Sequence, residues 1–123
     1  MKIGFISLGC SKNRVDSENV MGLLSANQHI MVSEPSEAEA IFVNTCGFIT
    51  PAKEEAINTI LQMSEIKKQT GAKLVVLGCL SQRYHDDLIK LLPEVDRYIT
   101  LDEYPLMDEI LTKELNIVVK GVY

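Results

Sequence analysis

The chain has 123 residues, 46% of them hydrophobic, and a formal net charge of −5, which suits one folded domain with an aliphatic core. No apolar run approaches the roughly 20 residues that a membrane-spanning helix needs, and the first residues lack the layout of a signal peptide. We therefore expect a cytoplasmic protein with no membrane partner. Acidic charge and scattered Lys and Arg disfavour direct nucleic-acid binding by this domain.

Short β-branched runs alternate along the chain with stretches whose apolar residues recur at helical spacing. The expected strands cover residues 2–8, 29–32, 40–44, 73–77 and 97–100. The short run at 29–32 is expected at an edge of the sheet. The continuously apolar run at 40–44 is expected to be buried on both faces, as central parallel strands are.

Four helices are expected, the first from the helical spacing of its apolar residues and the other three from capping residues, glycine and proline near their ends. These helices cover residues 15–24, 50–70, 81–92 and 102–111. We place Leu61 on the apolar face of the second helix, which Gly71 is expected to end. Asp102 is the expected cap of the fourth helix, and Leu106 is placed on that helix's apolar face.

Strands that alternate with helices predict an α/β fold with an open, mostly parallel five-stranded sheet and helices on both faces. Connections should be right-handed, and the expected strand order is 2-1-3-4-5, as in flavodoxin-like and other Rossmann-like folds. We expect this domain to cover residues 1–114. The apolar run at 117–119 has no obvious partner within the chain, so residues 115–123 are expected to be a linker or the truncated start of a further segment.

Each of the three cysteines follows the carboxyl end of an expected strand. Cys10 comes after the first strand, Cys46 after the third and Cys79 after the fourth. Ligands of open α/β sheets bind outside these ends, and strands about 4.8 Å apart would hold the three thiols along roughly 10 Å of one edge. A shared site is the favoured interpretation. Three unrelated core thiols remain the alternative, because cysteine is among the most buried residue types.

The number of cysteines restricts what they could bind. An odd count in a reducing compartment argues against a disulfide framework. Structural zinc sites usually take four ligands, often from Cys-x-x-Cys pairs, and the sequence contains no such pair. Soft thiolates suit iron–sulfur clusters. A [4Fe–4S] cluster on three cysteines leaves one iron without a protein ligand, which indicates chemistry at that iron rather than electron transfer alone.

The residues around the cysteines resemble the motifs of the radical-SAM methylthiotransferases. The matching blocks, in the order found in that family, lie at 7–18, 44–49, 52–55, 78–84 and 93–96. The resemblance implies an N-terminal domain whose [4Fe–4S] cluster is held by Cys10, Cys46 and Cys79. Such an enzyme inserts a methylthio group at an unactivated carbon of its substrate.

The resemblance also implies two further domains that this sequence does not contain. One is a radical-SAM domain with a second [4Fe–4S] cluster, which cleaves S-adenosylmethionine, and the other is a substrate-binding TRAM domain. We therefore expect the chain alone not to catalyse the full reaction.

The second and third blocks favour one type within the family. They read Cys-Gly-Phe-Ile at 46–49 and Cys-Leu-Ser-Gln-Arg-Tyr at 79–84. These forms favour the type that modifies an aspartate of a small-subunit ribosomal protein over the type that modifies an adenosine of tRNA. Ser11 departs from the first type, which usually has proline there. A ribosomal protein is thus the expected partner, with tRNA as the alternative substrate.

Polar residues in the same blocks are candidates to support the cysteine loops. Hydrogen bonds from them would orient the ligands and tune the cluster. They are Asn13, Asp16 and Ser17 from the first block and Asn44 and Thr45 from the second. Ordinary helix capping, or a polar turn after a strand, explains them equally well.

One alternative belongs to a different class of function. A cysteine directly after the first strand also resembles the phosphocysteine loop of sugar-phosphotransferase subunits, in which Cys10 would carry a phosphate. That interpretation leaves Cys46 and Cys79 without a role. Bound iron and labile sulfide would separate the two interpretations.

Overall fold

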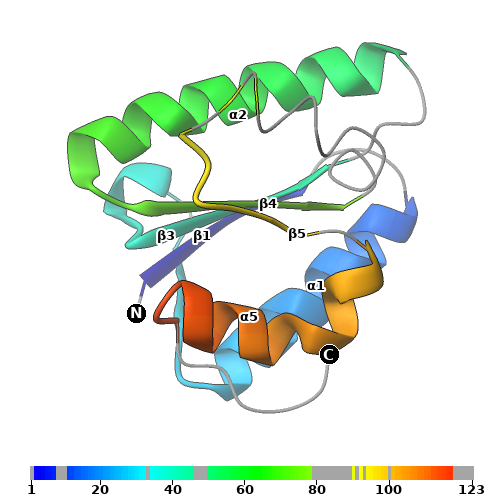
Figure 1. Cartoon of the computed structure of the whole chain (residues 1–123), viewed down its shortest axis with the longest axis vertical. Coiled ribbons are helices and arrows are strands. Elements are labelled where there is room, and N and C mark those ends of the chain that lie inside the picture. The colour runs from blue at the N-terminus through cyan, green and yellow to red at the C-terminus, as the bar shows by residue number, and fades with distance from the viewer. Residues whose placement is uncertain are drawn as a thin grey trace.

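The computed structural model describes residues 2–7, 11–32, 34–45, 50–78, 90, 92, 94–99 and 101–117. These residues form a five-stranded sheet with helices on both faces (Figure 1). The strands are β1 (Lys2–Ser7), β2 (Ile30–Val32), β3 (Ala40–Thr45), β4 (Lys73–Gly78) and β5 (Arg97–Ile99). The described helices are α1 (Ser11–Ala26), α2 (Thr50–Thr70) and α5 (Met107–Glu114), with short 3₁₀ helices η1 (Pro35–Glu37) and η2 (Leu101–Leu106).

The strand order is β2-β1-β3-β4-β5, and every neighbouring pair is parallel. The predicted order 2-1-3-4-5 and the α/β class are therefore confirmed. β3 lies at the centre and all six of its residues are buried, as predicted for a strand that is covered on both faces. The ring of Phe42 on β3 stacks with the ring of Phe5 on β1, with the two centroids 5.9 Å apart.

Alternate side chains of the sheet divide between two hydrophobic clusters, one on each face. Ala40 and Phe42 belong to the cluster beneath α1 and α5, whereas Ile41 and Val43 belong to the cluster beneath α2. Figure 1 shows α2 on one side of the sheet and α1 with α5 on the other. This division follows from the two-residue period of a strand, and it assigns each strand residue to one helical layer.

Each of the α-helices α1, α2 and α5 is followed within two residues by a residue with positive φ. These residues are Gln28 (69°), Gly71 (75°) and Asn116 (57°). After α1, the His29 amide donates to the Leu24 carbonyl at 3.2 Å, the hydrogen bond that is typical of a Schellman cap. The prediction that Gly71 ends the second helix is confirmed, since α2 stops at the residue before it.

The predicted start of the last helix is wrong. α5 begins at Met107, with Leu106 rather than Asp102 at its N-cap, and η2 precedes it. Pro105 explains the difference, because its ring disfavours the α conformation of the preceding Tyr104. Leu106, which was placed on the apolar face, is 49% exposed.

Two further helix predictions concern the placement of Leu61 and the helix expected at 81–92, and the first of them is wrong. Leu61 was placed on the apolar face of α2 but is 46% exposed. Among the described side chains of α2, Ile60, Met63 and Ser64 are buried, and the rotation of about 100° per residue carries Leu61 outward from the line that they form. The helix predicted at 81–92 falls almost entirely outside the described residues.

None of the described helices combines the length and apolar composition that a bilayer crossing requires.

The chain returns to the core after α5. Asn116 reverses its direction, and the Ile117 amide donates to the Leu111 carbonyl at 2.9 Å. Leu115 and Ile117 are 5% and 0% exposed and pack in the cluster beneath α1 and α5. The expectation that the segment from residue 115 has no partner within the chain is therefore wrong for these two residues. Residues 118–123 lie outside the described part.

Candidate functional site

The carboxyl ends of three central strands meet at one edge of the sheet, which we call the cysteine edge because the three cysteines follow it in the sequence. β1 ends at Ser7, β3 at Thr45 and β4 at Gly78. The register pairs Ser7 with Asn44 and Thr45 with Gly78. The strand order reverses between β1 and β3, and this switch point is where open α/β sheets bind their ligands.

The predicted metal ligands come immediately after these strand ends in the sequence. Cys46 follows Thr45, Cys79 follows Gly78, and Cys10 is the third residue after Ser7. All three cysteines lie outside the described residues, so their common site stays a prediction. Within the ranges that the structure does describe, no three His, Cys, Asp or Glu side chains are grouped as a metal site requires.

Asn44 and Thr45 end the central strand, and both are fully buried. The Thr45 hydroxyl donates to the Leu77 carbonyl at 2.8 Å, which joins the end of β3 to β4 and satisfies a buried polar group. Strand alternation puts Asn44 on the face of Phe42, under α1, and Thr45 on the face of Val43, under α2. Sequence reasoning named both residues but had no signal for the partner of Thr45, since that partner depends on the register of another strand.

The other candidate supporting residues lie in the first two turns of α1. They are Asn13, Asp16 and Ser17, and their side chains are outside what the structure describes. Helical spacing puts these positions on the same side of α1 as Val20 and Leu24, which pack against the sheet.

Two helices begin at the cysteine edge. α1 starts at Ser11 and α2 at Thr50, and both run back along the sheet from there (Figure 1). The first amides of a helix have no partner within it, and the aligned peptide dipoles place partial positive charge at this end. Helix N-termini therefore stabilise anions. This arrangement suits a negatively charged group such as a cluster held by thiolates.

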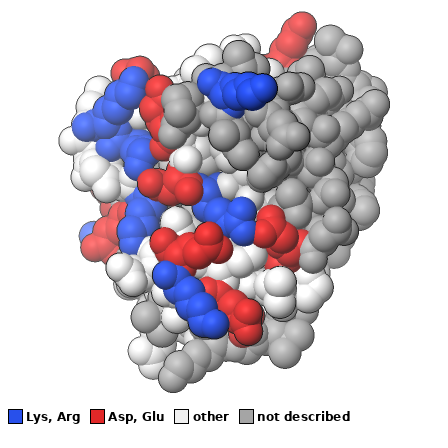
Figure 2. All heavy atoms as spheres, viewed as in Figure 1, with Lys and Arg blue, Asp and Glu red and all other residues white. Residues whose placement is uncertain are grey.

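Charged side chains are mixed over the visible surface. Figure 2 shows Lys and Arg interspersed with Asp and Glu over the described part of this face. A basic stripe, the usual footprint of a nucleic-acid site, is not present on the described part of this face. The view agrees with the net charge of −5.

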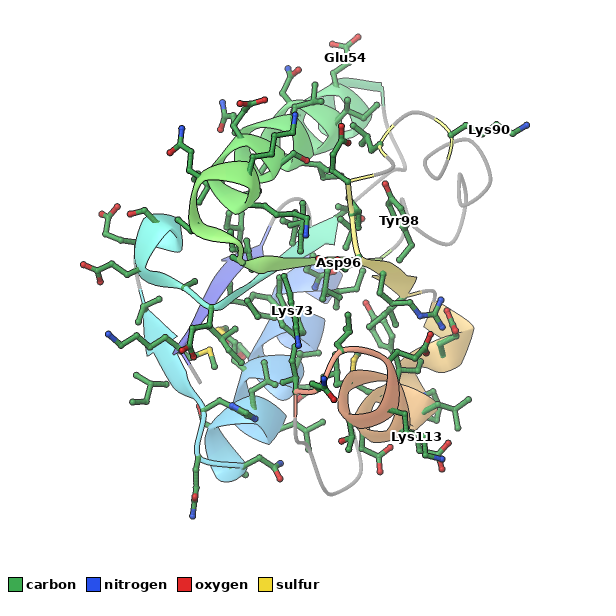
Figure 3. All side chains as sticks on the ribbon, turned by 60° about the vertical axis from the view of Figure 1, so that its left-hand side comes forward. Glu54, Lys73, Lys90, Asp96, Tyr98 and Lys113 are labelled. Atoms are coloured by element: carbon green, nitrogen blue, oxygen red, sulfur yellow. The ribbon has the colours of Figure 1, made fainter. Side chains whose placement is uncertain are left out.

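A network of polar contacts holds the opposite, amino edge of the sheet. The Asp96 carboxylate accepts hydrogen bonds from Lys67 Nζ and from the Leu74 amide, each at 2.8 Å. Lys73 extends from β4 toward the end of α5 (Figure 3), where its Nζ donates to the Leu115 carbonyl. These contacts join α2, β4, β5 and the segment after α5, so their role is structural.

Tyr98 on β5 is buried, and its hydroxyl donates to the Leu92 carbonyl at 2.9 Å. Burial, and secondarily the negative charge of Glu94, raises the pKa of Tyr98 above its ordinary value. The phenol therefore stays neutral and keeps donating its hydrogen bond at physiological pH. Since this bond connects β5 to the residues just before it, Tyr98 stabilises the fold rather than the cysteine edge.

Curated proteins are similar to this chain over most of its length. The ribosomal protein uS12 methylthiotransferase RimO of Alkaliphilus oremlandii is 52% identical to it, covering 85% of this chain and 24% of the relative. Proteins of the same name from Acetivibrio thermocellus and Clostridium acetobutylicum are 53% and 44% identical, covering 89% and 100% of this chain and 23% and 28% of those relatives. The chain thus spans about a quarter of the length of these relatives.

A family model described as uncharacterized protein family UPF0004 matches residues 2–100. The match runs from β1 to the end of β5 and includes all the predicted ligands and supporting residues. It takes in well over half of the chain, and the names of the relatives confirm the predicted resemblance to methylthiotransferases. The chain therefore belongs to the UPF0004 family.

Proposed function

We propose that this chain is the iron–sulfur domain of an enzyme that inserts a methylthio group at an unactivated carbon. The observation that carries the proposal is the placement of three strand ends. β1, β3 and β4 are neighbours and end at the same edge of the sheet, and a cysteine follows each of them in the sequence. The names of the relatives support the same chemistry.

Chain geometry supports a shared site for the thiols. Cys46 and Cys79 directly follow the paired residues Thr45 and Gly78. Consecutive Cα atoms are about 3.8 Å apart and paired strands about 4.8 Å apart, so the Cα atoms of the two cysteines can be at most roughly 12 Å apart. Cys10 is the third residue after Ser7, which lets it reach at most about 11 Å from the end of β1.

The donor set fits a [4Fe–4S] cluster. Three soft thiolates from Cys10, Cys46 and Cys79 would hold it and leave one iron without a protein ligand. When bound, the cluster would supply the sulfur that is transferred to the substrate carbon. The chain's own contribution is to hold the three thiolates at one edge, with the N-termini of α1 and α2 stabilising their negative charge.

The polar residues at the cysteine edge would orient the ligand loops. Asn44 and Thr45 are buried at the end of β3, and Asn13, Asp16 and Ser17 lie in the first two turns of α1. Groups that hydrogen-bond around metal ligands fix the ligand orientation and tune the metal. We assign this supporting role to all five residues.

The rest of the enzyme would lie outside this chain, which spans about a quarter of the length of its relatives. We assign S-adenosylmethionine and a second [4Fe–4S] cluster to a radical-SAM domain in that remainder, followed by a TRAM domain. Residues 1–114 would form the iron–sulfur domain, with Leu115 and Ile117 packed into its core, and the isolated chain would not complete the reaction.

We propose a small-subunit ribosomal protein as the substrate, modified on an aspartate in the cytoplasm. The relatives' names specify ribosomal protein uS12, which favours this substrate over a tRNA adenosine. The same names give no support to a phosphocarrier that uses Cys10 alone, and we do not propose that function.

Anaerobic reconstitution with iron and sulfide tests the proposal. We expect about four iron and four sulfide per chain, and we expect each of Cys10→Ala, Cys46→Ala and Cys79→Ala to lose them. Ser64→Ala, a substitution in the interior of α2, serves as a control that retains them. A folded wild-type chain that binds no iron, or one in which a single cysteine is dispensable, would contradict the three-ligand site.

A further inference from the structure

We propose that Thr45 is a positioning residue for the cluster. Its hydroxyl fixes the end of β3 against β4 and thereby sets the separation of Cys46 and Cys79. This inference rests on the proposed function, because it concerns two of the three proposed ligands. It adds a specific contact, between a side chain of one strand and the backbone of the next, to the general supporting role of the polar residues.

The contact lies within two residues of both ligands. Thr45 Oγ1 is 2.8 Å from the Leu77 carbonyl oxygen, and both residues are fully buried. The register pairs Thr45 with Gly78, so the hydroxyl reaches back by one residue along β4. Thr45 directly precedes Cys46 and Leu77 is two residues before Cys79. The bond therefore spans the two strands beside the last described pair of the ladder.

The end of this ladder needs reinforcement. Thr45 and Gly78 form the last described pair of the ladder, and the end of a ladder opens more readily than the pairs within it. Gly78 contributes no side chain to the packing and leaves its backbone conformationally permissive. A hydrogen bond buried in apolar surroundings is stronger than one in water, so the Thr45 hydroxyl restrains the strand ends where the ligand loops leave the sheet.

Packing alone does not require a threonine at this position. Thr45 lies on the face of Ile41 and Val43, which are apolar and fully buried. Valine has nearly the same shape and would continue that apolar face without the cost of burying a hydroxyl. The hydroxyl is thus explained by its hydrogen bond, and the location of that bond connects it to the ligands.

Thr70 offers a matched control at the other end of the sheet. Its hydroxyl donates to the Ile66 carbonyl at 2.9 Å and accepts from the Ala72 amide at 3.3 Å. These bonds lie at the end of α2, just before β4 begins. Loss of this hydroxyl should change stability without changing the cysteine edge.

The first experiment compares Thr45→Val, Thr45→Ser and Thr70→Val in the reconstituted 123-residue chain. We expect Thr45→Val to lose iron to a chelator about tenfold faster, the lower range for residues that support metal ligands, and to shift the midpoint reduction potential. Thr45→Ser keeps the hydroxyl and should behave like wild type. Thr70→Val should retain the wild-type potential.

A second experiment uses the metal-free chain. In a Cys10→Ala background, short bifunctional thiol reagents of graded length report the separation of Cys46 and Cys79. We expect Thr45→Val to reduce crosslinking by the shortest reagent, and Thr45→Ser to restore it. Thr45→Ala removes the same hydroxyl with a smaller side chain, and it replaces Thr45→Val if that variant does not fold.

The outcomes separate the two proposals. Unchanged potential, iron loss and crosslinking in a folded Thr45→Val chain would overturn the positioning role and leave the proposed function intact. A wild-type chain that binds no iron but whose crosslinking still responds to Thr45→Val would overturn the proposed function while supporting the positioning of the two thiols.

Discussion

Ile117→Ala should destabilise the domain strongly, although the residue lies beyond the last helix. Its side chain is 0% exposed and packs in the cluster beneath α1 and α5. An isoleucine-to-alanine change at a buried site costs 2–5 kcal/mol, through lost transfer energy and the cavity that remains, so we expect about 3 kcal/mol. That is a large part of the roughly 5–15 kcal/mol that stabilises a domain.

Ile30→Ala is the matched control, because it removes the same atoms from an edge-strand residue that is 61% exposed. We expect it to cost less than about 1 kcal/mol. Urea unfolding followed by circular dichroism would measure both variants. With a slope of roughly 1–3 kcal/mol/M, Ile117→Ala should lower the midpoint by about 1–3 M. Equal effects of the two substitutions would refute the conclusion that the segment after α5 belongs to the core.

Three further predictions concern backbone strain, pH dependence and a buried hydroxyl. Gln28→Gly should raise stability by up to about 1 kcal/mol, because a residue with a side chain is strained at positive φ. Gly71→Ala should lower stability by about 1 kcal/mol through the backbone alone, since the added Cβ meets no atom within 4 Å. Thermal unfolding measures both variants, and shifts of the same sign would contradict this reasoning. The pKa of Tyr98 is raised in the fold, so its stabilisation should be complete below about pH 10, its ordinary pKa, and decline above that pH. Tyr98→Phe should cost about 1 kcal/mol near neutral pH and show a weaker alkaline decline in urea titrations. An unchanged alkaline decline would contradict this role of Tyr98. Ser64 Oγ is buried without a hydrogen-bond partner among the described residues. Ser64→Ala removes this hydroxyl and introduces a better helix former, so it should raise the urea midpoint; a lower midpoint would contradict this reasoning.

The sheet could be predicted from the sequence because parallel strands leave a strong local signal. The apolar run of β3 marks a strand that is buried on both faces, and alternation with helices restricts the connections to parallel crossovers. Gly71 marks the end of α2 because its positive φ suits glycine. These signals all lie within a few residues of the element that they specify.

The end of the chain could not be predicted because it depends on long-range contacts. Asn116 has to adopt the left-handed conformation, and Lys73, from the start of β4, binds the carbonyl of Leu115. The contact from Lys73 leaves no local pattern in the sequence, whereas asparagine is itself one of the residues that favour the left-handed conformation. Pro105 is a local signal, because its ring disfavours the α conformation of the preceding residue and so favours a later start of α5.

The candidate site likewise has features that the local sequence predicts and a contact that it does not. The local sequence predicts a buried strand that ends at Asn44 and a cysteine after each of three strands, although β3 extends one residue further, to Thr45. The hydrogen bond from Thr45 to Leu77 follows only from the register of β3 on β4, which is set by packing across the whole sheet. A slip of one residue would turn Thr45 to the opposite face and break this bond.

The two edges of the sheet therefore have different tasks. At the amino edge, Asp96 joins Lys67 to the start of β4. The Lys2 amide donates to the Glu39 carboxylate at 2.9 Å. These contacts connect elements that are distant in sequence and hold the layers together. At the cysteine edge, the described part of the chain places the buried polar residues Asn44 and Thr45 at the end of β3. Because the strands are anchored at one end, the other end can carry residues chosen for the site rather than for packing. The Thr45 hydroxyl then restores locally the restraint that the anchored end supplies through ion pairs and backbone contacts.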